Sequence, residues 1–240
     1  MKRLGLAISS RGFCSRRQAD KLILEQKVKV NGEIVTDFSF KVADNDQITI
    51  DGYENTITKN PDEFVYFLFN KPPDCVCTNN DPQGRKIYLD YFSNEDKKHH
   101  LFPIGRLDLK SQGLLIVTND GELYNKLMHP RNHVEKEYLV GVDKSLRKDE
   151  LKKFSQGLMI REGYETGPCE IKEYRMVGKT YYYLVILKQG KNRQIRESFK
   201  LFHIYVSFIE RIRIGSLEIG DLHLGKYRKL TIHELEKLKR

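Results

Sequence analysis

Residues 103–121 carry the sequence PIGRLDLKSQGLLIVTNDG, in which a short polar loop lies between two apolar segments. The apolar segments predict strands over 101–104 and 114–118, and the loop between them holds Arg106 and Asp108. Gly105 and Gly113 allow the backbone to turn sharply at either end of the loop. Such a loop can place one carboxylate in a cleft at a sheet edge. A solvated Arg106–Asp108 ion pair in a turn is the competing interpretation, and spacing alone favours it.

The sequence around this loop alternates between strand and helix patterns without a regular order. Further strands are predicted over 64–69, 138–142 and 181–187, with a turn at 119–121. Helices are predicted over 122–129, 149–156 and 194–202, the first stopped by Pro130 and the second by Gly157. This order indicates an α+β domain with a mixed sheet rather than a doubly wound parallel sheet.

The amino-terminal part of the chain has a different pattern and a strong positive charge. Residues 1–30 hold eight basic and two acidic side chains, so their net charge of +6 supplies most of the +9 of the whole chain. Helices over 3–12 and 16–26, the second capped by Ser15, precede a hairpin of strands 28–30 and 33–35 around Asn31-Gly32. A third strand is predicted over 48–50, and residues 53–62 are predicted to be a linker. Such a compact basic unit indicates a polyanion as its partner.

Composition excludes several classes of protein. The chain has 240 residues, of which 39% are hydrophobic, which is enough for a sizeable core and too much for a disordered protein. No apolar run approaches the roughly 18 residues of a membrane span, and the amino-terminus lacks the apolar core of a signal peptide. The four cysteines are irregularly spaced, which favours a reduced, cytoplasmic compartment.

Two more segments hold candidate functional residues. The segment 190–196, GKNRQIR, links a strand to a helix, and Arg193 and Arg196 would share a face if that helix began early. A basic helix start is the structural alternative, although cations are unfavourable at the positive end of a helix. Tyr138 lies on the Val140 face of its predicted strand, where a core tyrosine with a bonded hydroxyl is the commoner outcome.

Two further motifs are weak. Cys75-x-Cys77 with His99-His100 would suit the zinc site of a metal-dependent nuclease or hydrolase, but a single C-x-C is more often a chance match. The segment 220–226 nearly matches a phosphate-binding loop, yet Tyr227 stands where a Ser or Thr must reach magnesium. We predict neither a metal nor a cofactor.

Several separated motifs together resemble one family. GRLD at 105–108, SQGLLIVTNDGEL at 111–123, EKEYLV at 135–140 and GKNRQIR at 190–196 resemble the bacterial RNA pseudouridine synthases of the RsuA/RluB/RluE/RluF family. RGFCSRRQAD at 11–20 and VKVNGEIV at 28–35 resemble the S4 RNA-binding domain that precedes their catalytic domain. SQG after the aspartate is most similar to the RluF branch. The resemblance implies an S4 domain over 1–58 and a mostly antiparallel catalytic sheet with flanking helices over 62–240.

The resemblance also implies roles for individual residues. It makes Asp108 the catalytic aspartate, Tyr138 the residue against the target base and Arg196 the partner of the aspartate. Ile209 would close the pocket, where leucine is commoner, and Gln26 and Leu6 stand where the RNA-binding domain usually has glycine and lysine. Arg106 would fill the space that a flipped base leaves, and Arg193 would contact substrate. The cations expected to bind RNA are Arg3, Arg11, Arg16, Arg17 and Lys29.

The activity implied is isomerisation of a uridine in ribosomal RNA, most simply the large-subunit 23S rRNA, by a monomer without cofactor or metal. Free rRNA and a ribosomal subunit precursor are both admissible substrates, and no membrane partner is expected. Small-subunit rRNA is an alternative substrate. A non-catalytic RNA-binding factor in ribosome assembly is an alternative function, which the basic amino-terminal unit alone would support.

Overall fold

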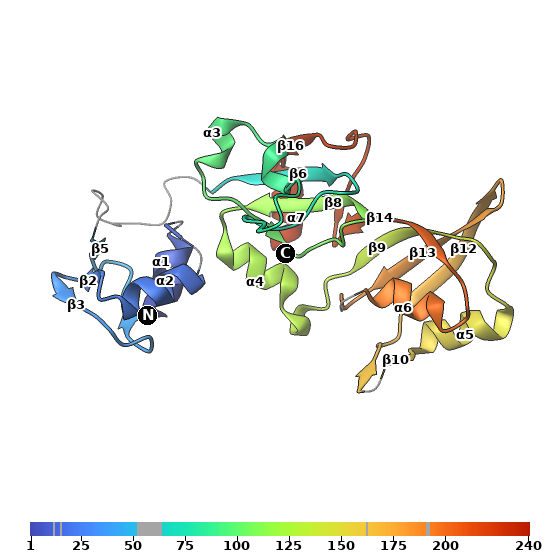
Figure 1. Cartoon of the computed structure of the whole chain (residues 1–240), viewed down its shortest axis with the longest axis horizontal. Helices are drawn as coiled ribbons and strands as arrows, with labels where there is room; N and C mark the ends of the chain where they lie inside the picture. Colours follow the sequence, from blue (N-terminus) through green and yellow to red (C-terminus); the bar gives the residue numbers. More distant parts are fainter. Residues whose placement is uncertain (12, 15, 52–63, 162, 191–192) are drawn as a thin grey trace. The chain divides into compact units, whose positions relative to one another are not determined.

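The computed structural model describes residues 1–11, 13–14, 16–51, 64–161, 163–190 and 193–240 (Figure 1). The chain forms two compact units. The first comprises 1–66 with the segments 93–102 and 118–123, and the second comprises 67–92, 103–117 and 124–240. The predicted linker and domain boundary, the cap Ser15 and the helix stop Gly12 lie outside the described residues.

The amino-terminal residues fold as a small α-β unit, as predicted. Its elements are β1 (Lys2–Arg3), α1 (Leu4–Ser10), α2 (Arg16–Leu24), β2 (Val28–Val30), β3 (Glu33–Ile34), β4 (Lys41–Val42) and β5 (Ile48–Ile50). Strands β3, β2 and β5 form an antiparallel sheet, and β1 pairs with β4. Ala19, Leu22 and Ile23 turn one face of α2 into the core, which is the helical spacing that the sequence shows. Asn31 and Gly32 both have positive φ, as a tight hairpin turn requires.

The large sheet has the order β12-β13-β9-β14-β8-β6-β16. Its strands are β6 (Tyr66–Lys71), β8 (Gln112–Thr118), β9 (Lys136–Val142), β12 (Glu170–Val177), β13 (Thr180–Leu187), β14 (Val206–Ile214) and β16 (Tyr227–Lys229). Short β7 (Phe102–Ile104) and β15 (Leu217–Glu218) pair with β8 and β14, while β10 (Met159–Arg161) and β11 (Tyr164–Glu165) pair separately. The pair β8–β14 is parallel, and β9–β13, β9–β14, β12–β13 and β6–β16 are antiparallel. The predicted mixed, mostly antiparallel α+β fold is confirmed.

The helices are α3 (Asn94–Lys97), α4 (Gly121–Met128), α5 (Lys148–Gln156), α6 (Gln194–Lys200) and α7 (Ile232–Lys239), with 3₁₀ turns at Tyr88–Tyr91 and Pro130–Asn132. Helices α5 and α6 pack on the sheet through three aromatic rings. The ring centroid of Phe199 on α6 lies 4.9 Å from that of Phe154 on α5 and 5.8 Å from that of Tyr183 on β13. Tyr183 is on the same side of the sheet as the residues of the cavity described below. None of the helices in the described ranges is both long and apolar enough to span a membrane.

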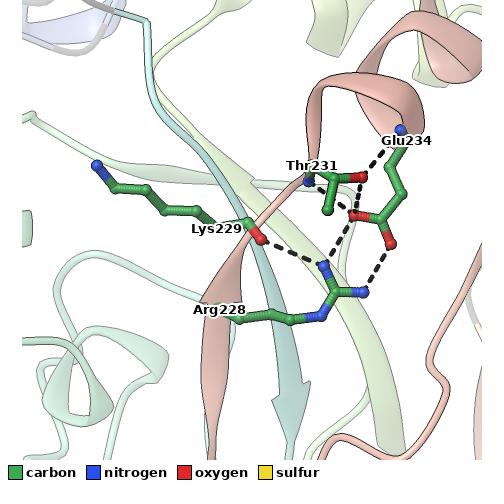
Figure 2. A network of polar contacts seen from close by, with 4 residues as sticks. All are labelled: Arg228, Lys229, Thr231 and Glu234. Atoms are coloured by element: carbon green, nitrogen blue, oxygen red, sulfur yellow. Dashed lines mark hydrogen bonds and ion pairs between the residues drawn. The ribbon is translucent and has the colours of Figure 1, made fainter.

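The carboxyl-terminal segment is closed by one polar network (Figure 2). Arg228 on β16 donates two hydrogen bonds, of 2.8 and 2.6 Å, to the carboxylate of Glu234 on α7. Thr231 caps the helix by accepting from the Glu234 N–H, and Glu234 accepts from the Thr231 N–H in return. Strand β16 follows directly after residues 220–226, so the helix that a phosphate-binding loop requires is not there.

Candidate active site

The loop that carries Asp108 connects β7 to β8 and is held by backbone hydrogen bonds. The Ser111 N–H donates to the Asp108 carbonyl at 3.0 Å, and the Asp74 N–H donates to the Leu109 carbonyl at 2.8 Å. The Leu107 N–H points at the sulfur of buried Cys77, 3.5 Å away. These contacts fix the backbone of the loop, while Arg106 is exposed and the Asp108 side chain is 37% exposed.

Lys71, at the end of β6, also holds the Asp108 loop in place. Its side chain is fully buried, and its ammonium donates to the carbonyls of Pro72, Leu109 and Ser111 at 2.8, 3.4 and 2.7 Å. Burial lowers the pKa of Lys71, and nearby Cys77, Cys75, Asp74 and Asp108 act in the opposite direction. The sequence analysis missed this residue, because a lysine that ends an apolar strand is usually solvated.

Gly113 allows the loop to approach the floor of the sheet. It has φ of +106°, and a Cβ at this position would lie 2.3 Å from the backbone oxygen of Arg211 on β14. Backbone cannot withdraw as a flexible side chain can, so only glycine fits here. The close β8–β14 pairing therefore brings the residues of β14 under the Asp108 loop.

The loop, the sheet and the start of α6 enclose a cavity of about 610 Å³. Lys136 and Tyr138 on β9, Leu187 on β13, and Ile209 and Arg211 on β14 form its floor, since they share one face of the sheet. All six residues predicted to act in catalysis or substrate binding line it, namely Arg106, Asp108, Tyr138, Arg193, Arg196 and Ile209. The volume is that of an ordinary small-molecule or single-nucleotide pocket.

The charge of the cavity is strongly unbalanced. Among the described residues its charged lining side chains are one carboxylate, Asp108, and five cations: Arg106, Lys136, Arg193, Arg196 and Arg211. A concave site with this excess of positive charge attracts and holds anionic ligands. Its chemistry therefore suits a phosphate-bearing substrate on which a single carboxylate acts.

The expected pairing of Asp108 with Arg196 is not the ion pair that the structure contains. Within the part of the chain that the structure describes, the cation within ion-pair distance of Asp108 is Arg193, whose Nη1 lies 4.0 Å from Oδ2. Arg196 is buried deeper, and its Nη1 donates instead to the Val206 carbonyl at 2.8 Å, because a buried guanidinium takes the acceptor at hand.

Two nitrogens of Arg196, Nε and Nη2, are buried and have no hydrogen-bond partner among the described residues. Burial lowers the pKa of Arg196, as does neighbouring Arg193, whereas Asp108 raises it. Arg196 is therefore close enough to Asp108 for the carboxylate charge to affect the pKa of its guanidinium.

Tyr138 lies in the cavity floor, as its predicted strand and face require. Its side chain is 8% exposed, and along β9 Lys136, Tyr138 and Val140 are buried while Glu137 and Leu139 are only partly so. The face that holds Val140 is therefore the face of the cavity. A core role and a role against a bound ring are compatible here, because the cavity opens over the buried face.

Lys136 and Arg211, which the sequence analysis missed, are also in the floor. Lys136 is 7% and Arg211 2% exposed. Burial, and then the charge of Arg211, lowers the pKa of Lys136 to about 8. Alternation along EKEYLV (135–140) places Lys136 on the same face as Tyr138, and alternation along FIERI (208–212) places Arg211 on the same face as Ile209. The pattern therefore predicts both residues if charged side chains are accepted on a buried face.

The predicted RNA-binding cations of the amino-terminal unit differ in how they are engaged. Arg3, Arg16 and Arg17 are exposed. Lys29 pairs with Asp51 at 3.2 Å. Arg11 donates to the carbonyls of residues 43, 44 and 46 at 3.1 to 3.4 Å, so much of its guanidinium holds a loop of its own unit. The exposed three are the better placed for a phosphate backbone.

The zinc alternative gains no support from the described residues. Cys75 and Cys77 are buried, and Cys77 already accepts from the loop backbone. Among the residues that the structure describes, no group of three or more His, Cys, Asp or Glu side chains is placed to hold a metal ion.

Comparisons with known proteins give a consistent result. Residues 65–201 match the family described as RNA pseudouridylate synthase, and residues 2–48 match the S4 domain. The chain is 38% identical over 241 residues to the ribosomal large subunit pseudouridine synthase B of Bacillus subtilis (strain 168), with 100% of this chain and 96% of that protein covered. It is 36% identical over 233 residues to the dual-specificity RNA pseudouridine synthase RluF of Escherichia coli (strain K12), with 97% and 77% covered. A solved structure titled as a pseudouridylate synthase superposes with a TM-score of 0.72 at 29% identity, covering 99% of this chain and 100% of that one.

Proposed function

The chain belongs to the RNA pseudouridylate synthase family, and from this premise we propose that it converts one uridine of large-subunit ribosomal RNA to pseudouridine with Asp108 as its catalytic residue. The family makes the protein an isomerase, as the sequence motifs predicted. The names of the relatives, one a large-subunit enzyme and one of dual specificity, support ribosomal RNA as the substrate. Both match to a similar extent, so they do not favour the RluF branch over the other.

The reaction suits a site with one carboxylate. The N1–C1′ bond of uridine breaks, the base turns, and C5 takes the place of N1 on the sugar. Atoms and electrons are conserved, so the reaction consumes no second substrate. Asp108 either attacks the sugar or removes a sugar proton. The observation that carries this proposal is that Asp108 is the single carboxylate among the described lining residues of a cationic cavity.

The other residues of the cavity have roles that follow from their positions. Tyr138 packs against the base and assists proton movement at C5. Ile209, 5% exposed, supplies an apolar wall. Arg196 turns its free donors to Asp108 when the substrate excludes water, and Arg193 contacts the phosphate backbone at the exposed rim.

The target uridine must leave the stacked RNA to reach the cavity. Arg106 is exposed at the rim and can fill the space that the base leaves. The amino-terminal unit holds the RNA through phosphate contacts of its exposed cations, which is a salt-sensitive interaction. Which uridine is modified depends on these RNA contacts rather than on the cavity.

Asp108→Asn tests the proposal. The substitution keeps the size of the side chain and removes its charge, so turnover should fall on the order of a thousandfold or more while RNA binding is retained. Release of tritium from C5-labelled uridine in ribosomal RNA measures turnover, and filter binding measures affinity.

The matched control is Asp74→Asn. Asp74 lies beside the same loop, but its carboxylate is exposed and pairs with Lys110 at 2.7 Å. It should retain nearly full turnover. An Asp108→Asn protein with wild-type turnover would contradict the assignment. A wild-type protein that binds ribosomal RNA and releases no tritium would favour the non-catalytic assembly factor instead.

A further inference from the structure

Two cations lie deeper in the cavity than the proposed mechanism requires. Lys136 on β9 and Arg211 on β14 lie on the cavity face of the sheet, where the charge of Arg211 contributes to lowering the pKa of Lys136. The rim cations are different, since Arg106 is exposed and the Arg193 side chain is 53% exposed. The floor therefore holds two positive charges that are screened from water.

Neither floor cation is fully bonded. Lys136 Nζ donates to the Val134 carbonyl at 2.9 Å, although an ammonium has three donors. Arg211 Nε donates to the Leu114 carbonyl at 2.8 Å, but no residue in the described part of the chain bonds its buried Nη2. Among the described residues no carboxylate forms an ion pair with either of them. Buried charges without counter-charges are costly, so a fold retains them where a ligand completes them.

Asp108 is not that counter-charge. It lies at the loop, where Arg193 is within ion-pair distance and Arg196 senses its charge. The electrostatic neighbour of Lys136 is Arg211, another cation. A backbone phosphate is a poor occupant too, because it carries its full charge at all times and remains with the sugar chain at the open rim. The occupant must reach the floor and must be most negative during the reaction.

On the proposed function, the flipped uracil ring meets both conditions. We propose that Lys136 and Arg211 bind the carbonyl oxygens of the flipped uracil and stabilise the negative charge that the ring acquires when the glycosidic bond breaks. Fixed cations in a water-excluded site are most effective where charge develops in the transition state. The inference assigns the floor to the leaving base and the loop to the sugar.

The electrons balance for either role of Asp108. If its carboxylate bonds to C1′, it leaves with the electron pair of that bond as C5 bonds to C1′; if it removes a sugar proton, it returns that proton at the same stage. When N1–C1′ breaks, its electron pair stays with the ring and spreads over N1 and the two carbonyl oxygens. The ring then turns while its oxygens keep the two cations as partners. The C5–C1′ bond forms with an electron pair of the ring, C5 loses its proton, and N1 gains one. Nothing is oxidised or reduced.

Lys136→Met tests the inference, since methionine keeps the length of the stem and removes the charge. Conversion of the target uridine is followed in a single turnover at saturating RNA. We expect the rate to fall on the order of a hundredfold with unchanged RNA affinity. Lys136→Arg should recover most of the rate because it restores a cation. Lys153→Met, an exposed position on α5, is the matched control and should behave as wild type.

A second substrate separates chemistry from architecture. 5-Fluorouridine at the target position gives a better leaving base, because fluorine draws charge from the ring. A better leaving group needs less help, so the defect of Lys136→Met should be several-fold smaller with this RNA. Consumption of the 5-fluorouridine is measured after digestion, since no C5 proton remains to be released. A merely misshapen cavity would slow both substrates equally.

The outcomes are distinct. A wild-type single-turnover rate for Lys136→Met would overturn the inference, as would equal defects on both substrates. Weaker RNA binding with an unchanged rate at saturation would assign Lys136 to a phosphate. If Lys136→Met fails to fold, Lys136→Gln replaces it and is judged by the same ratio of defects. A wild-type enzyme that converts no uridine would overturn the proposed function itself, whereas an active wild type with unaffected variants would overturn the inference alone.

Discussion

The amino-terminal unit and the cavity of the large sheet both contain several cations, but the cations differ in exposure. Arg3, Arg16 and Arg17 are exposed, with freedom to follow a flexible polyanion. Lys136 and Arg211 are almost wholly buried and fixed by backbone carbonyls. Exposed cations gain affinity by releasing counterions and depend on salt. Buried ones are already oriented, and they act on charge that appears in one place.

The two regions also differ in how much the backbone must be constrained. The hairpin of the amino-terminal unit turns at Gly32 in open space, with nothing within 4 Å of an added Cβ. The Asp108 loop turns at Gly113 directly against the backbone of β14. Binding through exposed charge tolerates local adjustment, whereas a catalytic carboxylate tolerates little displacement.

The largest expected effect on stability is that of Gly113→Ala compared with Gly32→Ala. Both glycines have positive φ, so each alanine costs about 1 kcal/mol in backbone strain. At Gly113 the new methyl also overlaps the Arg211 backbone, for a total of about 3 kcal/mol. The melting temperature should fall by roughly 6–12 °C for Gly113→Ala, and turnover should fall with it.

Thermal unfolding followed by circular dichroism, with tritium release at a permissive temperature, measures both effects. Gly32→Ala should leave turnover at saturating RNA unchanged. Equal losses of stability and turnover for the two variants would remove the proposed difference between a tolerant unit and a constrained one.

The next effect in size concerns the exposed cations. Arg16→Ala combined with Arg17→Ala should weaken RNA binding about tenfold and reduce the slope of log affinity against log salt by roughly 1.4 to 1.8. Turnover at saturating RNA should stay unchanged, since neither residue lines the cavity. Filter binding over a range of salt concentrations measures the slope.

The charge-matched control is Lys152→Ala with Lys153→Ala, two exposed cations on α5. A slope that changes equally in both double variants would show that total charge, rather than the amino-terminal unit, governs binding.

Local signals allowed much of this molecule to be predicted from sequence. The Asn-Gly pair between two alternating segments predicts the β2–β3 hairpin from the eight residues 28–35 alone. The two glycines on either side of Asp108 predict the turns of its loop. Tyr138 was placed on the correct face because a strand alternates strictly. The resemblance of the motifs to one family predicted that the cavity residues lie in one site. The spacing of these residues in the sequence could not predict this.

The rest depends on contacts between distant segments. Strand β12 has almost wholly exposed side chains, so no buried face marked it in advance. Strand β14 places a buried arginine among its apolar residues, which breaks the apolar alternation. Lys71, Lys136 and Arg211 were missed because burial of a charge is decided by partners far away in the sequence. The choice between Arg193 and Arg196 as the neighbour of Asp108 is likewise a matter of tertiary geometry.

The smallest expected effect lies at the Arg228–Glu234 pair drawn in Figure 2. Its side chains are 39% and 23% exposed, which is intermediate between the exposed and the buried cations compared above. The hydrogen bond from Arg228 is the main cause that lowers the pKa of Glu234 from 4.5 to about 2. A depressed carboxyl pKa stabilises the fold above the unfolded-state value, and this stabilisation is lost as the pH falls from 4.5 towards 2. Glu234→Gln should therefore cost about 0.5–1 kcal/mol at pH 7, because solvent screens a partly exposed pair. The difference from wild type, measured as melting temperatures between pH 7 and pH 3, should shrink as the pH falls.

Glu95→Gln, which breaks an exposed pair with Lys98, is the matched control and should change the melting temperature less. If Glu95→Gln costs as much as Glu234→Gln, then burial does not grade the strength of these charges, and the contrast between exposed and buried cations would need another cause.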